Sequence, residues 1–540
     1  MDDRHLHLRP VVRAEDIVKI SKTPVSRREL LRLGLFGTAT AAATLAGIDA
    51  LVWAPKRVAM AATSFPDIQF DIGNFINPVE TINSVPVHFG PIYTFLLPAK
   101  LNRNPTLADQ TVLANALNTI EANYAFSPSG IFVFVSYGLP YFNRLPSSLV
   151  ASHMPLRNDG SNQPVLQEAV PSPTDVSPLN PGISKQTFNV PVQIESNDVL
   201  FTLRSDILGH ATDVVAWFQG SNSLNGASVP SPAFNGLFSF GTPRVNFVQQ
   251  GLPRTLANQN NFPYAFEINP ASTMWMGFVD QQVGGSAPSG ATVTFAGTSS
   301  AILTTAHAGD YFDNGAIQHL SHDIQDLAQF YADPDEPFSE RVQYMFRSKM
   351  NNGQPGLPYF EDPNDAFTDG GGQNAPEGDI FQKEQSAYLF ATNFGPNDQA
   401  TNYDPAVLVQ VTNPHKKYRV GHLCGLQRSS RAGDGTPLHI RMDGPGLNTL
   451  DVPGGALQPT LEFTIFVPTA EFFRVMRVNA ASLDYVKAGQ GGGTAASVPP
   501  GVEAADADDD GLERFLTATR RQNFLCPPRR HRAFPLLELA

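Results

Sequence analysis

The chain has 540 residues, 42% of them apolar and 16% charged, which is enough material for about two globular units. Its net charge of −13 argues against a nucleic-acid-binding protein, because such proteins present a basic face. The two cysteines, Cys424 and Cys526, exclude a metal–thiolate framework and leave room for one disulfide bond.

The N-terminal segment has the pattern of an export signal. An S-R-R-E-L-L motif at residues 26–31 precedes a weakly apolar run over 33–52, and residues 59–61 form an A-x-A cleavage site. This pattern resembles a bacterial twin-arginine signal. We therefore expect residues 1–61 to be a signal peptide for the twin-arginine translocase, and the mature protein to be secreted or periplasmic. A membrane anchor is the alternative, but Asp49 interrupts the apolar run.

The next part of the chain alternates apolar strand patterns with helical ones. Hydrophobic periodicity and Gly, Pro and Asn punctuation predict strands over 85–101, 131–138, 198–206 and 238–249, with helices over 104–124 and 210–219. The resulting order, β-α-β-β-α-β, is that of a ferredoxin-like unit.

A second series of elements begins near residue 270. The patterns predict a strand over 314–324, a helix over 324–331, a strand over 461–467 and a helix over 470–485. Residues 332–430 are rich in Pro, Gly and Asn, so we expect a long insertion outside the sheets. We assign 62–260 to an N-terminal half, 261–487 to a C-terminal half with the site, and 488–540 to a flexible linker and closing tail.

The stretch 434–443 contains the most informative histidine. An Asp-Gly turn and a proline precede His439, which is flanked by Leu438 and Ile440 and followed by Arg441. A neutral imidazole among apolar groups can ligate iron when a second group fixes its other ring nitrogen. The alternative is an ordinary core histidine whose polar atoms are satisfied.

Several short motifs, taken in order, resemble the dye-decolorizing (Dyp-type) peroxidase family. They are a glycine-ended strand with an aromatic close at 134–145, a strand at 199–206, G-F-V-D at 277–280, a strand-to-helix segment at 315–327 and H-I-R at 439–441. The resemblance runs from about residue 85 to residue 486. It implies an α+β fold of two ferredoxin-like halves with antiparallel sheets, of the dimeric α+β barrel type, around one haem.

The resemblance also implies roles for particular residues. His439 corresponds to the proximal ligand of the haem iron, Arg441 to a haem-binding residue, and Asp280 to the catalytic group that moves a proton of hydrogen peroxide. The family's distal arginine has no counterpart, because no Arg occurs between Arg441 and Arg474. Removing one such charge-stabilising group typically costs ~10²–10³ in rate, so we expect weakened oxidation of small organic substrates.

Other functions remain open or are disfavoured. The chain could instead be a non-catalytic exported binding or surface-interaction protein that keeps the fold without haem, and a homo-oligomer is left open. His319 and His322 fall in a predicted strand, where their side chains would point to opposite faces, which disfavours a shared metal site. No phosphate-binding loop or G-x-S-x-G elbow is present, so the sequence does not support a nucleotide-binding protein or a serine hydrolase.

Overall fold

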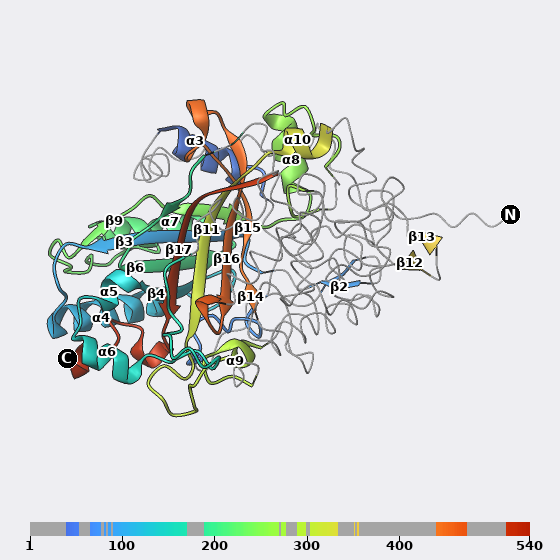
Figure 1. The fold of residues 1–540 in the computed structure, drawn as a ribbon. Coiled ribbons are helices and arrows are strands. Elements are labelled where there is room, and N and C mark those ends of the chain that lie inside the picture. Colours follow the sequence, from blue (N-terminus) through green and yellow to red (C-terminus); the bar gives the residue numbers. More distant parts are fainter. Residues whose placement is uncertain are drawn as a thin grey trace.

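The structure is a computed structural model that describes two parts of the chain in detail, one before and one after a long insertion (Figure 1). The described residues are 39–52, 65–76, 80–82, 85–87, 90–169, 188, 190–268, 272–276, 289–298, 303–332, 350–351, 354–355, 439–471 and 515–540. Within these ranges no helix is both long and apolar enough to cross a membrane.

The first half forms a four-stranded antiparallel sheet with two helices. Its elements are, in chain order, β3 (Tyr93–Leu101), α4 (Leu107–Asn123), β4 (Phe132–Gly138), β6 (Val199–Ser205), α7 (Leu208–Phe218), β9 (Phe238–Phe240) and β10 (Arg244–Phe247). The sheet order is β10-β3-β6-β4, with β9 pairing the other end of β3. The last strand therefore lies beside the first, as in a ferredoxin-like unit.

The second half repeats this arrangement. Its elements are β11 (Ala316–Gln325), α10 (Leu327–Ala332), β14 (Ile440–Arg441), β15 (Gly444–Asn448), β16 (Gln458–Val467) and β17 (Leu516–Cys526). Strands β14 and β15 both pair with β16 in the order β17-β11-β16-β14, so the last strand again lies beside the first. The halves join where β17 pairs with β4, and the predicted fold of two antiparallel ferredoxin-like halves is confirmed.

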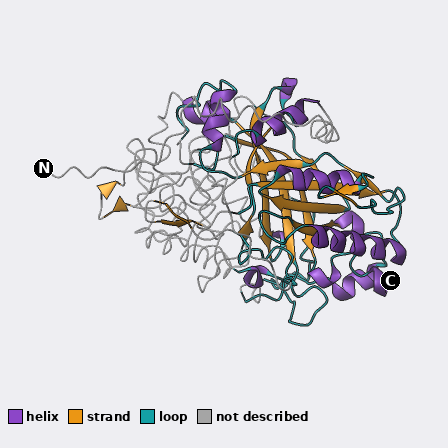
Figure 2. Ribbon diagram, turned by 180° about the vertical axis from the view of Figure 1, so that it is seen from behind, coloured by secondary structure: helices purple, strands orange, loops and turns teal. Residues whose placement is uncertain are grey.

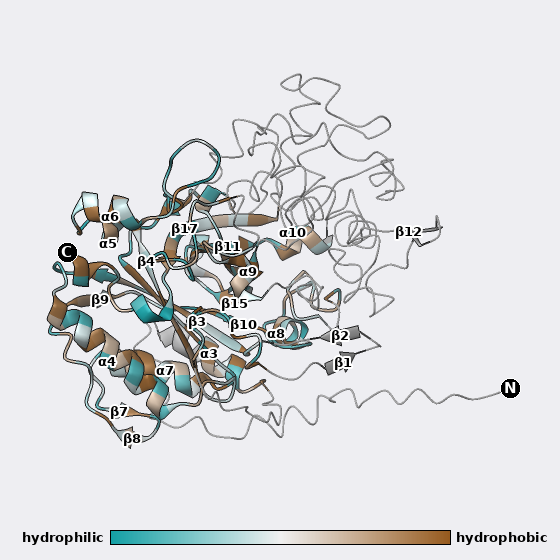
Figure 3. Ribbon diagram, turned by 90° about the horizontal axis from the view of Figure 1, so that it is seen from below, coloured by the Kyte–Doolittle hydropathy of each residue, from teal (hydrophilic) through white to brown (hydrophobic). Residues whose placement is uncertain are grey.

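The helices of the first half are held by apolar side chains, on one face of α4 and over most of α7. Thr106 caps α4 by accepting a hydrogen bond from the backbone N–H of Asp109, whose side chain accepts one from the Thr106 N–H in return. Leu113, Leu117 and Ile120 then follow at helical spacing and are buried against the sheet. Figure 3 shows the hydrophobic and hydrophilic residues that alternate along α4 and α7. Both helices pack in the core that contains the sheet.

The opposite face of the combined sheet carries a buried polar cluster that connects the halves. Gln318 of β11 accepts a hydrogen bond from the Ser136 hydroxyl over 2.6 Å and donates to Thr202 and Thr464 over 3.1 and 3.2 Å. All four side chains are fully buried. Because each polar group has a partner, the cluster links strands of the two halves without leaving an uncompensated buried group. In the view from behind, the strands form one curved sheet flanked by helices (Figure 2).

The sheet curves until its two outer strands meet. Asn246 of β10 donates to the carbonyl of Met442, which directly follows β14, over 3.3 Å. A Cβ added at Gly446 would lie 2.4 Å from the Thr460 hydroxyl and 3.3 Å from the Val245 carbonyl oxygen. Glycine on β15 therefore permits the close approach of β10, which gives the fold its barrel-like shape.

Helix α3 (Ala39–Asp49) lies within the segment that the sequence predicts to be a signal peptide. Its residue Ile48 is buried in the main core, and the Asp49 carboxylate accepts a hydrogen bond from the Tyr93 hydroxyl over 2.8 Å. The uncleaved chain thus holds part of this segment against the first half. Removal of residues 1–61 stays a prediction.

The remaining described elements are short. They are β1 (Glu80–Ile82), β2 (Val85–Val87), α5 (Leu139–Phe142), α6 (Ser147–His153), β5 (Gln193–Ile194), β7 (Ser223–Leu224), β8 (Ala227–Ser228), α8 (Leu252–Gln259), α9 (Gly290–Val293), β12 (Met350–Asn351), β13 (Gln354–Pro355), and the 3₁₀ turns η4 (Pro453–Gly455), η6 (Arg529–His531) and η7 (Leu537–Leu539).

Two expectations from the sequence need correction. The strand expected over 238–249 is two short strands, β9 and β10. Residues 516–526, placed in a closing tail, form β17, which lies between β4 and β11 in the middle of the sheet. The other expected boundaries stay predictions. Most of the insertion at 332–430 and the helix expected over 470–485 lie outside the described residues, as does Cys424, while Cys526 is a buried free thiol.

Candidate functional site

The strand register of the second half determines which side chains share a face. Arg441 of β14 pairs with Ile465, Ile465 pairs with His319, and His319 pairs with Asn523. Directly opposite residues of antiparallel strands point to the same side, so Arg441, His319 and Asn523 share one face. Two strand spacings separate Arg441 from His319, which corresponds to roughly 10 Å between their backbones.

The predicted iron ligand lies at the edge of this face. His439 comes directly before β14 and is only 3% exposed, whereas Arg441 is half-buried. Extending the strand alternation by one residue places His439 on the same side as Arg441. Asp280, the predicted proton-moving group, lies outside the described residues. The roles assigned to these three residues therefore stay predictions.

His319 is the centre of a directional chain of hydrogen bonds on this face. Its Nδ1 lies 2.7 Å from the Asn523 side-chain oxygen, and its Nε2 lies 2.5 Å from the Ser321 hydroxyl. The Asn523 amide nitrogen donates to the Gln167 carbonyl over 3.0 Å, which fixes the orientation of that amide. Because the Asn523 oxygen can only accept, Nδ1 carries a proton, and in the neutral imidazole Nε2 then accepts from the Ser321 hydroxyl.

This arrangement provides a base of defined tautomer. The unprotonated Nε2 of His319 can take a proton from the Ser321 hydroxyl or from a group that reaches it. His319, Ser321 and Asn523 are at most 3% exposed, so these hydrogen bonds are shielded from bulk solvent.

A buried arginine lies beside these hydrogen-bonded side chains. Arg521 of β17 pairs with Ser321 of β11, so its side chain is on the same face as His319. It is 2% exposed. The face thus combines a neutral base, a hydroxyl and a guanidinium group within two neighbouring strands.

His322 points to the opposite face and forms a separate pair. Its Nδ1 lies 2.7 Å from a Glu462 carboxylate oxygen, and its Nε2 lies 3.2 Å from the Leu450 carbonyl. The side chains of His322 and Glu462 are fully buried. Burial alone would lower the pKa of His322, but the charge of Glu462 and the hydrogen bond to it outweigh burial and raise this pKa above its ordinary value. As the strand pattern predicts, His319 and His322 do not converge, and the described residues contain no cluster of three or more His, Cys, Asp or Glu placed to hold a metal ion.

Sequence reasoning missed Ser321, Asn523 and Arg521. The local signal for Ser321 is its spacing of two residues from His319 in a strand, which puts both side chains on one face. Asn523 and Arg521 give no such signal, because they are about 200 residues away along the chain and meet His319 and Ser321 only through strand pairing.

Residues 91–356 match a family model described as "Family of unknown function (DUF7405)". No curated protein matches the chain.

Among solved structures, the chain is similar to Dyp-type peroxidases. A Dyp-type peroxidase protein from Shewanella oneidensis has 14% identity and a TM-score of 0.42, with 82% of this chain and 94% of that chain covered. The encapsulated DyP-type peroxidase from Mycobacterium smegmatis has 13% identity and a TM-score of 0.40, with 85% and 98% covered. A DypB variant from Rhodococcus jostii RHA1 in complex with heme has 12% identity and a TM-score of 0.39, with 82% and 94% covered. These superpositions are loose, so the fold is defined by this chain's own strand order.

Proposed function

We propose that the chain is an exported haem protein of the dye-decolorizing peroxidase type, with weakened hydrogen-peroxide-dependent oxidation of small organic molecules as its activity. The observation that carries the proposal is the position of His439. It is a buried imidazole directly before β14, two residues from Arg441, in the second of two ferredoxin-like halves. The order of the other short motifs along the sequence gives further support.

The residues present fit a haem in their donor chemistry. A buried imidazole is a common axial ligand of haem iron, and His439 would hold the iron. A half-buried guanidinium is suited to a propionate carboxylate, which Arg441 would pair with. When bound, the haem supplies the redox chemistry with peroxide, and the protein supplies orientation, protons and charge.

The protein groups for proton movement are Asp280 and His319. Asp280 is proposed from its motif alone. His319 is supported by its hydrogen bonds, because Asn523 holds Nδ1 protonated and leaves Nε2 as a base on the face that Arg441 shares.

The cation of this site is proposed to be Arg521. No Arg occurs in residues 442–473, where the family has its distal arginine. Arg521 reaches the same face from β17 and is buried beside Ser321. A guanidinium in a poorly solvated site stabilises developing negative charge, so part of the lost charge stabilisation would be restored from a different strand.

The absorption spectrum of the protein purified through its own export route tests the proposal. A Soret band with about one haem per chain is the expected result, and peroxide-dependent oxidation of a dye should accompany it. Haem without turnover would indicate a haem-binding protein without catalysis. Absence of a Soret band after supplying haem during expression would contradict the proposal and favour the alternative, an exported binding or surface-interaction protein that keeps the fold without haem.

Export is proposed from the S-R-R-E-L-L motif and the A-x-A site. Arg27→Lys combined with Arg28→Lys should leave an uncleaved precursor inside the cell, because the translocase requires the arginine pair. Unchanged secretion of the double variant would rule out this route. In wild type, N-terminal sequencing should place the mature end near Ala62.

A further inference from the structure

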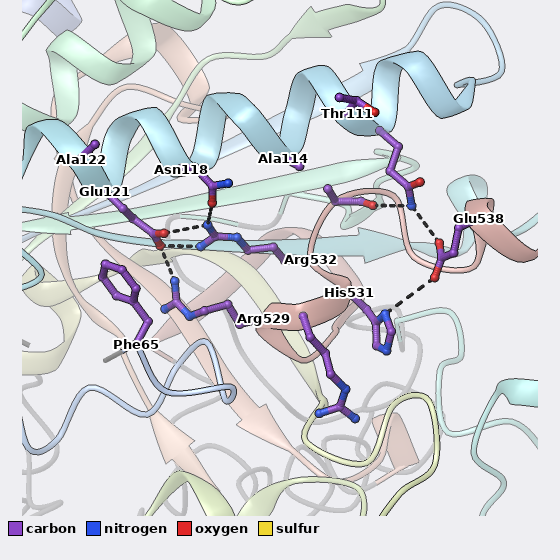
Figure 4. Close-up of a pocket in the computed structure, with 13 residues that line it drawn as sticks. Phe65, Thr111, Ala114, Asn118, Glu121, Ala122, Arg529, His531, Arg532 and Glu538 are labelled. Carbon is purple, nitrogen blue, oxygen red and sulfur yellow. Dashed lines mark hydrogen bonds and ion pairs between the residues drawn. The ribbon is translucent and has the colours of Figure 1, made fainter. Parts of the chain in front are cut away.

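A pocket of about 780 Å³ lies between α4 of the first half and the C-terminal segment 529–538 (Figure 4). Its lining residues do not include His439. From α4 it is lined by Thr111, Ala114, Asn118 and Ala122, which recur every three or four residues and so share one helix face. Three of these four side chains are small, which leaves open space beside the helix. The opposite wall carries four consecutive basic residues, Arg529, Arg530, His531 and Arg532.

The charges at one end of the pocket do not balance. Arg532 Nη2 donates to a Glu121 carboxylate oxygen over 2.7 Å, and Arg529 forms an ion pair with the same carboxylate. Within the described residues no second carboxylate pairs with either guanidinium. Two positive groups therefore share one negative charge, which leaves a surplus of one positive charge at this end.

The positive charge of Arg529 is only partly compensated by its surroundings. Its guanidinium lies 5.1 Å from the centre of the Phe65 ring and 5.2 Å from that of Phe126, and one of its terminal nitrogens, Nη2, has no hydrogen-bond partner in the described part of the chain. Burial, followed by the nearby charge of Arg532, lowers the pKa of Arg529 in spite of Glu121. The pair of guanidinium groups is thus held together at an electrostatic cost.

The rest of the pocket has no surplus positive charge. Arg530 pairs with both Asp67 and Asp313. At the far end, the Glu538 carboxylate accepts hydrogen bonds from Gln110 over 2.8 Å and from the Tyr311 hydroxyl over 2.5 Å. The surplus positive charge is therefore confined to the end near Asn118, and the opposite end would repel an anion.

We propose that this pocket binds a small organic anion, with a carboxylate or phosphate group at the Arg529–Arg532 end and an apolar body along the small residues of α4. A guanidinium presents a planar fork of N–H donors that matches either oxyanion. The exposed part of Phe65 and the methyl groups of Ala114 and Ala122 supply an apolar wall for the body. This site is independent of the haem proposal.

The test compares two variants of α4 that carry the same charge change. Asn118 lines the pocket and accepts a hydrogen bond from Arg532 over 3.0 Å, whereas Asn115 is exposed on the same helix outside the pocket. Asn118→Asp adds a carboxylate beside Arg532 and cancels the surplus charge without removing any partner. Asn115→Asp is the matched control.

Titration calorimetry of the full chain at low ionic strength, with phenyl phosphate, inorganic phosphate and neutral phenol as probes, gives the measurement. Wild type and Asn115→Asp should bind phenyl phosphate more tightly than inorganic phosphate, and phenol should not bind. Asn118→Asp should weaken phenyl phosphate binding about tenfold or more, because like charges repel at this distance. Ala114→Phe, which fills the pocket, should abolish binding of phenyl phosphate. Equal affinity of wild type and Asn118→Asp, or no binding to wild type, would overturn the proposal.

Discussion

At the scale of single residues, the second half separates two histidines that are close in sequence. His319 and His322 lie on the same strand, yet one faces Ser321 and Asn523 while the other faces Glu462. Both are fully buried. The Nδ1 of His319 lies against the Asn523 oxygen and its Nε2 against the Ser321 hydroxyl, whereas His322 is placed between two acceptors that favour its charged form.

The proposed role of Arg521 leads to the first prediction. Arg521→Gln should retain haem but lower peroxide-dependent dye oxidation by roughly 10²–10³, because one charge-stabilising group is lost. Arg103→Gln, at an exposed residue just before α4, is the control and should leave turnover unchanged. Haem content and kcat measured on the same preparations make the comparison. Unchanged turnover with Arg521→Gln would remove this residue from the site.

The His322–Glu462 pair predicts how stability depends on pH. Because the pKa of His322 is raised in the folded protein, its stabilising contribution is fully present below the pKa of the unfolded chain and is lost as the pH rises through the folded pKa. Urea unfolding should therefore show a lower free energy of unfolding at pH 9 than at pH 6.

Glu462→Gln isolates this contribution. Removing one partner of a buried pair should lower the free energy of unfolding by about 3–5 kcal/mol at pH 6, and the decline toward pH 9 should become shallower. A variant whose pH dependence is the same as that of wild type would show that another group causes the decline.

At the scale of secondary-structure elements, closure of the sheet depends on glycine in β15. Gly446→Ala places a methyl group 2.4 Å from the Thr460 hydroxyl of β16 and 3.3 Å from the Val245 carbonyl oxygen of β10, so the neighbouring strands must shift, and we expect a loss of about 1–3 kcal/mol in the free energy of unfolding. In Gly209→Ala the nearest atom lies 4.0 Å from the added methyl, and this control in α7 should be as stable as wild type or slightly more stable. Equal unfolding midpoints for Gly446→Ala and wild type would contradict the close approach.

The sequence predicts the elements that have apolar periodicity and misses the one that does not. The strand expected over 131–138 is found as β4, and the helix expected over 104–124 is found as α4, because local pattern and burial agree there. Strand β17 contains Thr, Arg, Gln and Asn, yet most of it is buried. Its polar side chains form hydrogen bonds with residues far away in sequence, such as Asn523 with His319. The hydrophobic pattern of the strand itself does not indicate these partners.

The candidate site divides in the same way. His439 and Arg441 could be found from sequence because they belong to one short motif, and the structure adds that His439 is buried. Asn523 and Arg521 could not be found, because the register between β11 and β17 brings them to the site. That register includes a bulge after His322, which a sequence pattern does not reveal.

At the scale of the whole molecule, β17 is the strand that unites the two halves. It pairs with β11 over its full length and with β4 at its C-terminal end. A chain ending after residue 514 loses this strand, so we expect it to lose cooperative unfolding in urea and to expose apolar surface to a dye such as ANS. A chain ending after residue 536 keeps β17 and should still unfold cooperatively. Cooperative folding of the shorter chain would show that the halves are joined by other contacts.

The most direct test of the proposed function is the haem content of His439→Ala. Haem per chain is measured by the pyridine haemochrome method on wild type, His439→Ala and His307→Ala, the last being an exposed histidine outside the site. We expect about one haem per chain in wild type and in His307→Ala, and none in His439→Ala, because the buried imidazole is the proposed iron ligand. Equal haem content in wild type and His439→Ala would contradict the assignment.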